Sequence, residues 1–196
     1  MMPSLNARKT AWFLAAMACW PETAKAHFEG SGVGPLLHGA THAFSVGGAL
    51  AVIAVALWFG SAGKRLARMG TATLVPAWAI GMLFNGSLSG AAALAAPLAA
   101  MVAGSLLAFS PRLSERWTLL LVAAVGGVLG WSDGGAALGM AERIGAIAAI
   151  GVVALYTAVI AQAAVSRGAA PLLRIVGGAT IIISGAVALL SWPPPS

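Results

Sequence analysis

Residues 27–60 read HFEGSGVGPLLHGATHAFSVGGALAVIAVALWFG, and this stretch combines metal-binding side chains with a long apolar run. It holds all three histidines of the chain, His27, His38 and His42. The apolar run covers residues 35–60, and about 20 apolar residues suffice to cross a hydrocarbon core of about 30 Å. The stretch therefore predicts a membrane helix that carries histidines near one end.

The composition of the whole chain agrees with a membrane protein. Hydrophobic residues make up 60% of the 196 residues and charged residues 8%, with a mean hydropathy of +0.92. Soluble chains carry about 25% charged residues. The net charge of +6 comes from small groups of basic residues between apolar runs, a pattern that orients membrane helices. We therefore expect the lipid bilayer, and no nucleic acid, as a partner.

The first 26 residues have the three-part pattern of a secretory signal peptide. A basic start is followed by a short apolar core and by small residues at the cleavage positions: Arg8-Lys9, residues 10–20 and Ala24-Lys25-Ala26. Cleavage would leave His27 first and would remove Cys19, the single cysteine, so we expect neither a disulfide nor a thiolate metal site. An uncleaved N-terminal helix and a lipoprotein modified at Cys19 are the alternatives.

Six apolar runs predict that residues 27–196 form one all-α domain, a bundle of six transmembrane helices. Small-residue repeats such as Gly126-xxx-Gly130 and the pair Gly177-Gly178 predict close helix packing, because such faces let backbones approach in lipid. Pro76 should kink the second span, which membrane bundles tolerate. The predicted spans are residues 35–60, 69–88, 91–109, 117–135, 144–165 and 171–192.

The loops between these spans predict the orientation of the chain. Of the eight basic residues after position 26, seven fall on one side, which the positive-inside rule makes cytoplasmic. These seven are Lys64, Arg65, Arg68, Arg112, Arg116, Arg167 and Arg174. The histidines, Asp133 and Glu142 then lie on the outer face. We expect a multi-pass protein of the bacterial inner membrane with both mature termini outside the cytoplasm.

His38 and His42 are the strongest candidates for metal ligands. Four residues apart on a helix, their Cβ atoms lie about 5–6 Å apart on one face, close enough to share a divalent cation. Neutral imidazole binds nickel, cobalt, copper and zinc. The alternative is that both rings meet lipid headgroups or hydrogen-bond to another helix.

Two further residues complete the predicted metal site. His27 would offer an α-amine and an imidazole if cleavage exposes it, and Asp133 would bring a carboxylate to the outer end of the fourth span. The alternatives are an incidental residue after a cleavage site and a solvated loop carboxylate. Glu142 beside Arg143 predicts an interfacial charge pair. No catalytic arrangement stands out, so we expect no enzyme activity.

Several motifs resemble the HupE/UreJ family of membrane proteins linked to hydrogenase and urease maturation. The similar features are Ala26-His27 after the signal, the first-helix stretch at residues 32–60 with its ending Ala56-Leu57-Trp58, and the closing stretch from Leu173 through Gly185. The resemblance implies a six-helix protein that conducts nickel or cobalt.

Two functions are therefore expected. The first is a secondary permease for a transition-metal cation, nickel or else cobalt, that captures the ion outside the cytoplasm and holds no tightly bound cofactor. The second is a membrane accessory or scaffold that assists assembly of a metalloenzyme and does not transport. A homo-oligomer or a membrane partner is compatible with both.

Overall fold

The computed structural model describes residues 33–44, 46–84, 89–110, 113–134 and 138–191. The predicted signal peptide and His27 lie outside these residues. Within the described ranges the chain is all-α, as the sequence predicts, with no strand. The helices are α2 (Gly34–His42), α3 (Val46–Ser61), α4 (Lys64–Leu83), α5 (Ser89–Phe109), α6 (Glu115–Gly134), α7 (Met140–Ser166) and α8 (Ala170–Leu190).

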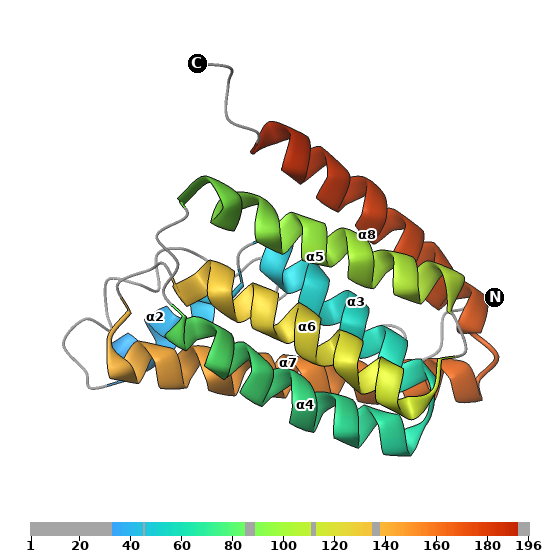
Figure 1. Ribbon diagram of the computed structural model, residues 1–196. Helices are drawn as coiled ribbons and strands as arrows, with labels where there is room; N and C mark the ends of the chain where they lie inside the picture. Colours follow the sequence, from blue (N-terminus) through green and yellow to red (C-terminus); the bar gives the residue numbers. More distant parts are fainter. Residues whose placement is uncertain (1–32, 45, 85–88, 111–112, 135–137, 192–196) are drawn as a thin grey trace, which may run out of the picture.

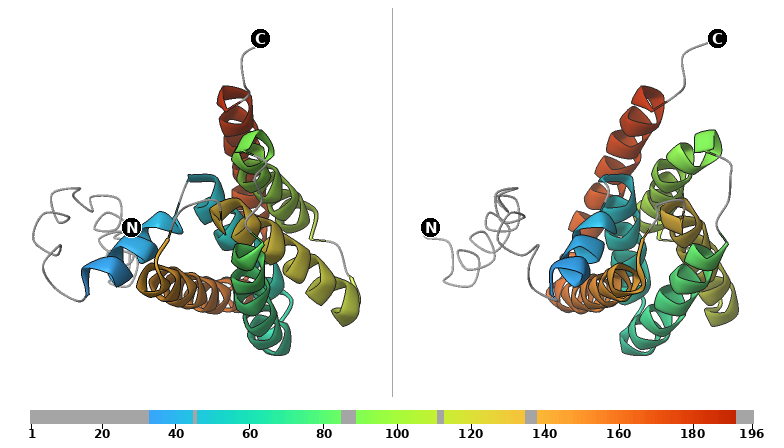
Figure 2. Two further views of the ribbon diagram at one scale, coloured as in Figure 1. Left: turned by 60° about the vertical axis from the view of Figure 1, so that its left-hand side comes forward. Right: turned by 90° about the vertical axis from the view of Figure 1, so that its left-hand side faces the viewer.

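Helix α3 forms the centre of the bundle (Figures 1 and 2). It lies between α5 and α7, α8 packs on the outer side of α5, and α4 pairs with α6. Ala54, Val55, Ala56 and Phe59 of α3 are fully buried. A helix that is apolar on every side lies in a protein core or in a membrane, so the VGGALAVIAVALWFG run suits the central place of α3, where Ile53 is the one exposed large side chain among the described residues of the helix.

Three helices, α4, α7 and α8, are long and apolar enough to cross a membrane. The predicted first span, residues 35–60, is divided into α2 and α3, whose axes differ by 75°, and the two together would make a fourth span. Polarity explains the division. Helix α2 exposes His38, Thr41 and His42, and exposed polar side chains are costly in hydrocarbon, whereas α3 has no charged side chain.

Glycines set the close contacts between neighbouring helices. A Cβ atom added to Gly126 would lie 2.8 Å from the Leu74 carbonyl oxygen, and one added to Gly130 would collide with the Trp78 carbonyl. The predicted Gly126-xxx-Gly130 face therefore packs directly on α4. On the other side of the molecule, Gly177 of α8 faces Gly104 of α5. These contacts replace the hydrophobic driving force that lipid-exposed helices lack.

The adjacent glycines of α8 allow a matched test of this packing. A Cβ at Gly177 would lie 2.5 Å from the Ala108 nitrogen and 2.7 Å from the Gly104 oxygen, whereas one at Gly178 would meet nothing within 4 Å. Overpacking costs about 1–3 kcal/mol, while Gly→Ala in an open helical position stabilises by about 0.5–1 kcal/mol. We expect Gly177→Ala to lower, and Gly178→Ala to keep or raise, the thermal unfolding midpoint in detergent. Equal midpoints would contradict the α5–α8 contact.

Candidate metal site

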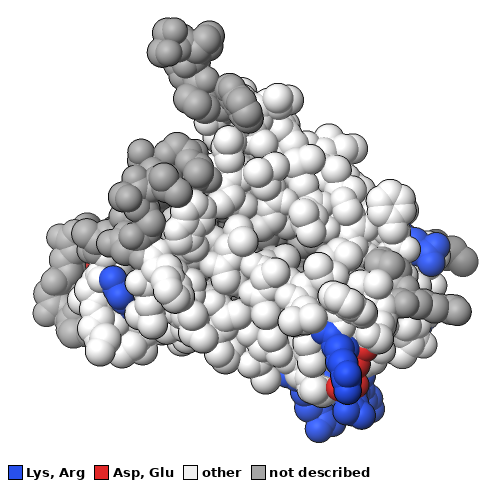
Figure 3. Space-filling view, in the orientation of Figure 1, with Lys and Arg blue, Asp and Glu red and all other residues white. Residues whose placement is uncertain are grey.

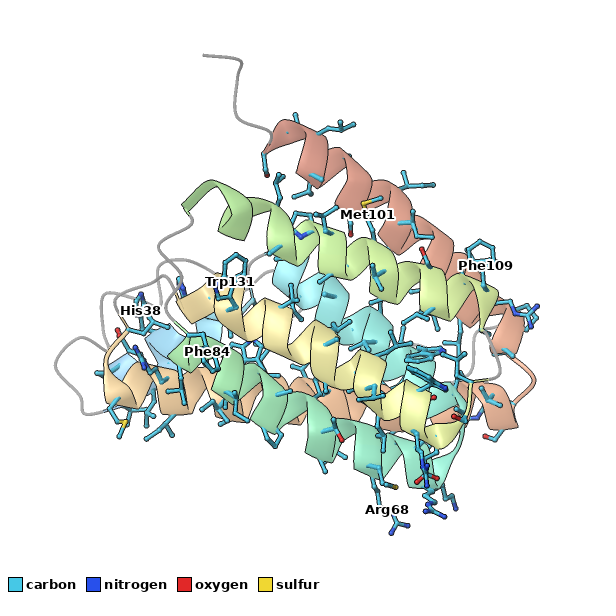
Figure 4. The ribbon with its side chains drawn as sticks, viewed as in Figure 1. His38, Arg68, Phe84, Met101, Phe109 and Trp131 are labelled. Atoms are coloured by element: carbon cyan, nitrogen blue, oxygen red, sulfur yellow. The ribbon has the colours of Figure 1, made fainter. Side chains whose placement is uncertain are left out.

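The two ends of the bundle differ in charge and chemistry. Helix α2, the C-terminal end of α6 and the N-terminal end of α7 lie together at one end (Figure 1). Figure 4 shows His38 and Trp131 at this end and Arg68 at the other. Lys64, Arg65 and Arg116 belong to the end that holds Arg68, where α4 and α6 begin. This separation agrees with the loop charges of the sequence.

A hydrogen bond between the His38 ring and the Glu142 carboxylate joins α2 to α7. The Nδ1 atom of His38 lies 2.7 Å from Oε1 of Glu142, and the other carboxylate oxygen accepts the Gly139 N–H at 2.7 Å. An ionised carboxylate only accepts hydrogen bonds, so Nδ1 of His38 carries the proton. In the neutral ring, Nε2 is then left with a free lone pair. Carboxylates hold metal-binding histidines in this way, fixing the tautomer and the ring orientation.

His42 lies one helical turn beyond His38. The two ring centroids are 6.4 Å apart and the ring planes are inclined by 37°. Two imidazoles on one ion, with metal–nitrogen bonds of about 2.0–2.1 Å, have centroids roughly 4.5–5.2 Å apart at tetrahedral or octahedral angles. The two rings are therefore farther apart than in a metal-bound pair, and they would have to move closer to share one ion.

Two glycines bring α2 close enough to α7 for the hydrogen bond between His38 and Glu142 to form. A Cβ at Gly39 would collide with the backbone of Glu142, and a Cβ at Gly145 would collide with the backbone of Leu36. The helices thus cross at backbone contact, with His38 next to the crossing point. Gly39 follows His38 directly. Two neighbouring residues therefore supply the candidate ligand, His38, and the close contact with α7 that positions its ring.

Asp133 lies outside this crossing. It is half-buried near the end of α6 and accepts a hydrogen bond from Trp78 of α4, a side chain that is 1% exposed. Across the described ranges, no three His, Cys, Asp or Glu side chains form a group that could hold a metal ion. The structure thus places His38 next to His42 on one side and hydrogen-bonds it to Glu142 on the other, and it places Asp133 on the neighbouring helix pair.

Glu142 is the residue whose role the sequence analysis missed. The charge pair expected between Glu142 and Arg143 is wrong, because the carboxylate contacts His38 and Gly139, while Nε of Arg143 donates to the Leu138 carbonyl at 3.2 Å. One sequence signal was available. A glutamate three residues after a helix N-cap accepts a backbone N–H, so its side chain is held back over the first turn, where α2 crosses.

These features define an all-α bundle with at least three helices suited to crossing a membrane, and two neighbouring histidines at one end, of which His38 is hydrogen-bonded to a carboxylate. Comparison with family models, with curated proteins and with solved structures gave no match.

Proposed function

We propose that this chain is a secondary permease of the bacterial inner membrane that takes up a divalent transition-metal cation, nickel first and cobalt second. The single observation that carries the proposal is the His38–Glu142 pair, with His42 one turn away. The choice of nickel follows the resemblance to the HupE/UreJ family. Imidazole ligands are compatible with this choice and also with copper and zinc.

The small number of ligands suits transport. A permeation pathway must bind an ion well enough to admit it and weakly enough to release it. Two neutral imidazoles leave most coordination positions to water, so the ion keeps part of its hydration. Asp133, on the same end of the bundle, and His27 are the proposed additional ligands along the path.

The direction of uptake follows from the charge distribution. The end with Lys64, Arg65 and Arg68 would face the cytoplasm by the positive-inside rule. His38 and His42, at the opposite end, would then face the extracytoplasmic side together with both termini of the mature chain. The predicted signal peptide, residues 1–26, fits an exported N-terminus.

The proposal is tested by cellular metal content at limiting external nickel, cobalt, copper and zinc. Cells with the wild type, with His38→Ala/His42→Ala, and without the protein are compared, after equal membrane levels are verified. We expect selective accumulation of nickel in the wild type alone. A triple variant that adds His27→Ala shows whether the N-terminal residue contributes. No accumulation of any of the four metals would refute the permease.

A second function, a membrane accessory that assists assembly of a metalloenzyme, is favoured by the outer face of α8. Ile182, Leu189 and Leu190 are 75%, 78% and 87% exposed, and α8 packs mainly on α5. Such a face would meet lipid or a partner helix. The accessory would leave metal content unchanged in the double histidine variant, whereas the permease would not.

A further inference from the structure

The basic end of the bundle carries charge that its own acidic residues do not neutralise. Lys64, Arg65, Arg68 and Arg116 are exposed there, and Figure 3 shows Lys and Arg side chains gathered at this end of the molecule. Among the residues that the structure describes, Glu115 is the acidic side chain of this end, and it pairs with Arg65 at 3.1 Å. The other three cations have no acidic partner within the described ranges.

A hollow of about 210 Å³ lies beside this charge, where the α3–α4 turn meets the end of α7. Ser61, Gly63 and Lys64 line it from one side, and Gln162, Val165 and Ser166 from the other. Gly60 lets α3 and α7 touch next to the hollow. A Cβ atom added to Gly60 would lie 2.7 Å from the backbone of Ala158. The chain then turns away at Gly63, whose φ of 123° favours glycine.

The hollow joins polar donors to an apolar strip. Ser61 and Ser166 donate their hydroxyls to backbone carbonyls, so Lys64 and Gln162 are the side chains with donors to offer a ligand. On α7, positions 155, 159, 162 and 166 share one helix face. Leu155 and Val159 on that face are 50% and 54% exposed. A ligand that matches this surface has an anionic head and an apolar tail.

We propose that this hollow binds the phosphodiester headgroup of an anionic phospholipid, with its acyl chain along Leu155 and Val159. Lys64 contacts the phosphate and Gln162 donates a second hydrogen bond. Arg68 lies one turn beyond Lys64 on the same face of α4 and strengthens the positive field. The apolar strip is the reason to choose a lipid over a soluble phosphate. This inference does not depend on metal transport.

The test uses the full chain, purified and delipidated in neutral detergent, with bound lipids counted by native mass spectrometry. Phosphatidylglycerol, phosphatidylcholine and inorganic phosphate are the probes. We expect phosphatidylglycerol to bind at least tenfold more tightly than phosphatidylcholine. Since each basic residue near an anionic lipid contributes about fivefold in affinity, Lys64→Gln and Arg68→Gln should each lower binding about fivefold.

Two further variants make the test specific. Arg174→Gln removes the same charge from α8, which contributes no residue to the lining of the hollow, and should keep the affinity of the wild type. Ser166→Phe fills the hollow without changing charge and should lower phosphatidylglycerol binding, with helicity checked by circular dichroism. Equal binding of both lipids would overturn the proposal. The proposal would also be overturned if Arg174→Gln lowered the affinity for phosphatidylglycerol as much as Lys64→Gln does. Loss of lipid binding in millimolar inorganic phosphate would overturn it as well.

Discussion

Replacing Glu142 with glutamine will lower the affinity of the purified chain for nickel about 10–100-fold, the usual effect of losing a carboxylate that orients a metal-binding histidine. Glutamine can still accept the Gly139 N–H, so α7 keeps the hydrogen bond at its start. Its amide then donates to Nδ1 of His38, which moves the ring proton to Nε2. The lone pair that would bind the ion is lost, while the shape of the side chain is unchanged.

Titration of the full chain with nickel, followed calorimetrically in detergent, measures this effect. Glu115→Gln is the matched control, because the Glu115 carboxylate also joins two helices, through an ion pair with Arg65, but at the opposite end of the bundle. That variant should bind nickel as the wild type does. If Glu142→Gln binds nickel as tightly as Glu115→Gln, Glu142 does not position His38 for metal binding.

Gly39→Ala will reduce nickel affinity by a similar factor although residue 39 is not itself a ligand. The added methyl group would collide with the backbone of Glu142, so α2 must move away from α7. His38 then loses the 2.7 Å contact with the carboxylate. Overpacking of this kind also destabilises by about 1–3 kcal/mol, so thermal unfolding should shift to lower temperature.

Gly151→Ala is the control for this substitution. A Cβ at Gly151 of α7 would lie 3.6 Å from a Val75 methyl, an ordinary van der Waals contact. Both variants add one methyl to a helical glycine, and only Gly39→Ala disturbs the crossing of α2 and α7. A Gly39→Ala variant with wild-type affinity and unfolding temperature would show that α2 does not depend on this contact.

The helices of this fold could largely be predicted from the sequence, because apolar runs of membrane length have few alternatives. The runs at residues 117–135 and 171–192 correspond to α6 and α8, and the Gly126-xxx-Gly130 face packs on α4 as expected. The break between α2 and α3 could not be predicted in the same way. The apolar run continues through it, and only the exposure of His38 and His42 shows that α2 is set apart from α3.

The site was less predictable than the fold. His38 and His42 are four residues apart on one helix, so their proximity could be predicted from the sequence alone. The contact between His38 and Glu142 joins residues 104 positions apart, and no local pattern specifies such a pair.

The arrangement also explains why α2 is a separate helix. Histidines that bind an aqueous ion would need an exposed surface, and a fixed ring orientation would need a partner residue. Packing α2 across the start of α7 meets both needs, since His38 keeps 58% of its side chain exposed and still contacts Glu142. A straight continuation of α3 would place the same residues along the apolar wall of the bundle.

Nickel binding to the purified full chain, measured as stoichiometry and Kd by equilibrium dialysis, tests the histidine pair most directly. The wild type and His38→Ala/His42→Ala are compared, with Thr41→Ala, which removes a hydroxyl bonded to the His38 carbonyl, as the control on the same helix. The proposed site predicts one ion per chain for the wild type and Thr41→Ala, and no binding at this site for the double variant. Equal binding by all three proteins would contradict a metal site at His38 and His42.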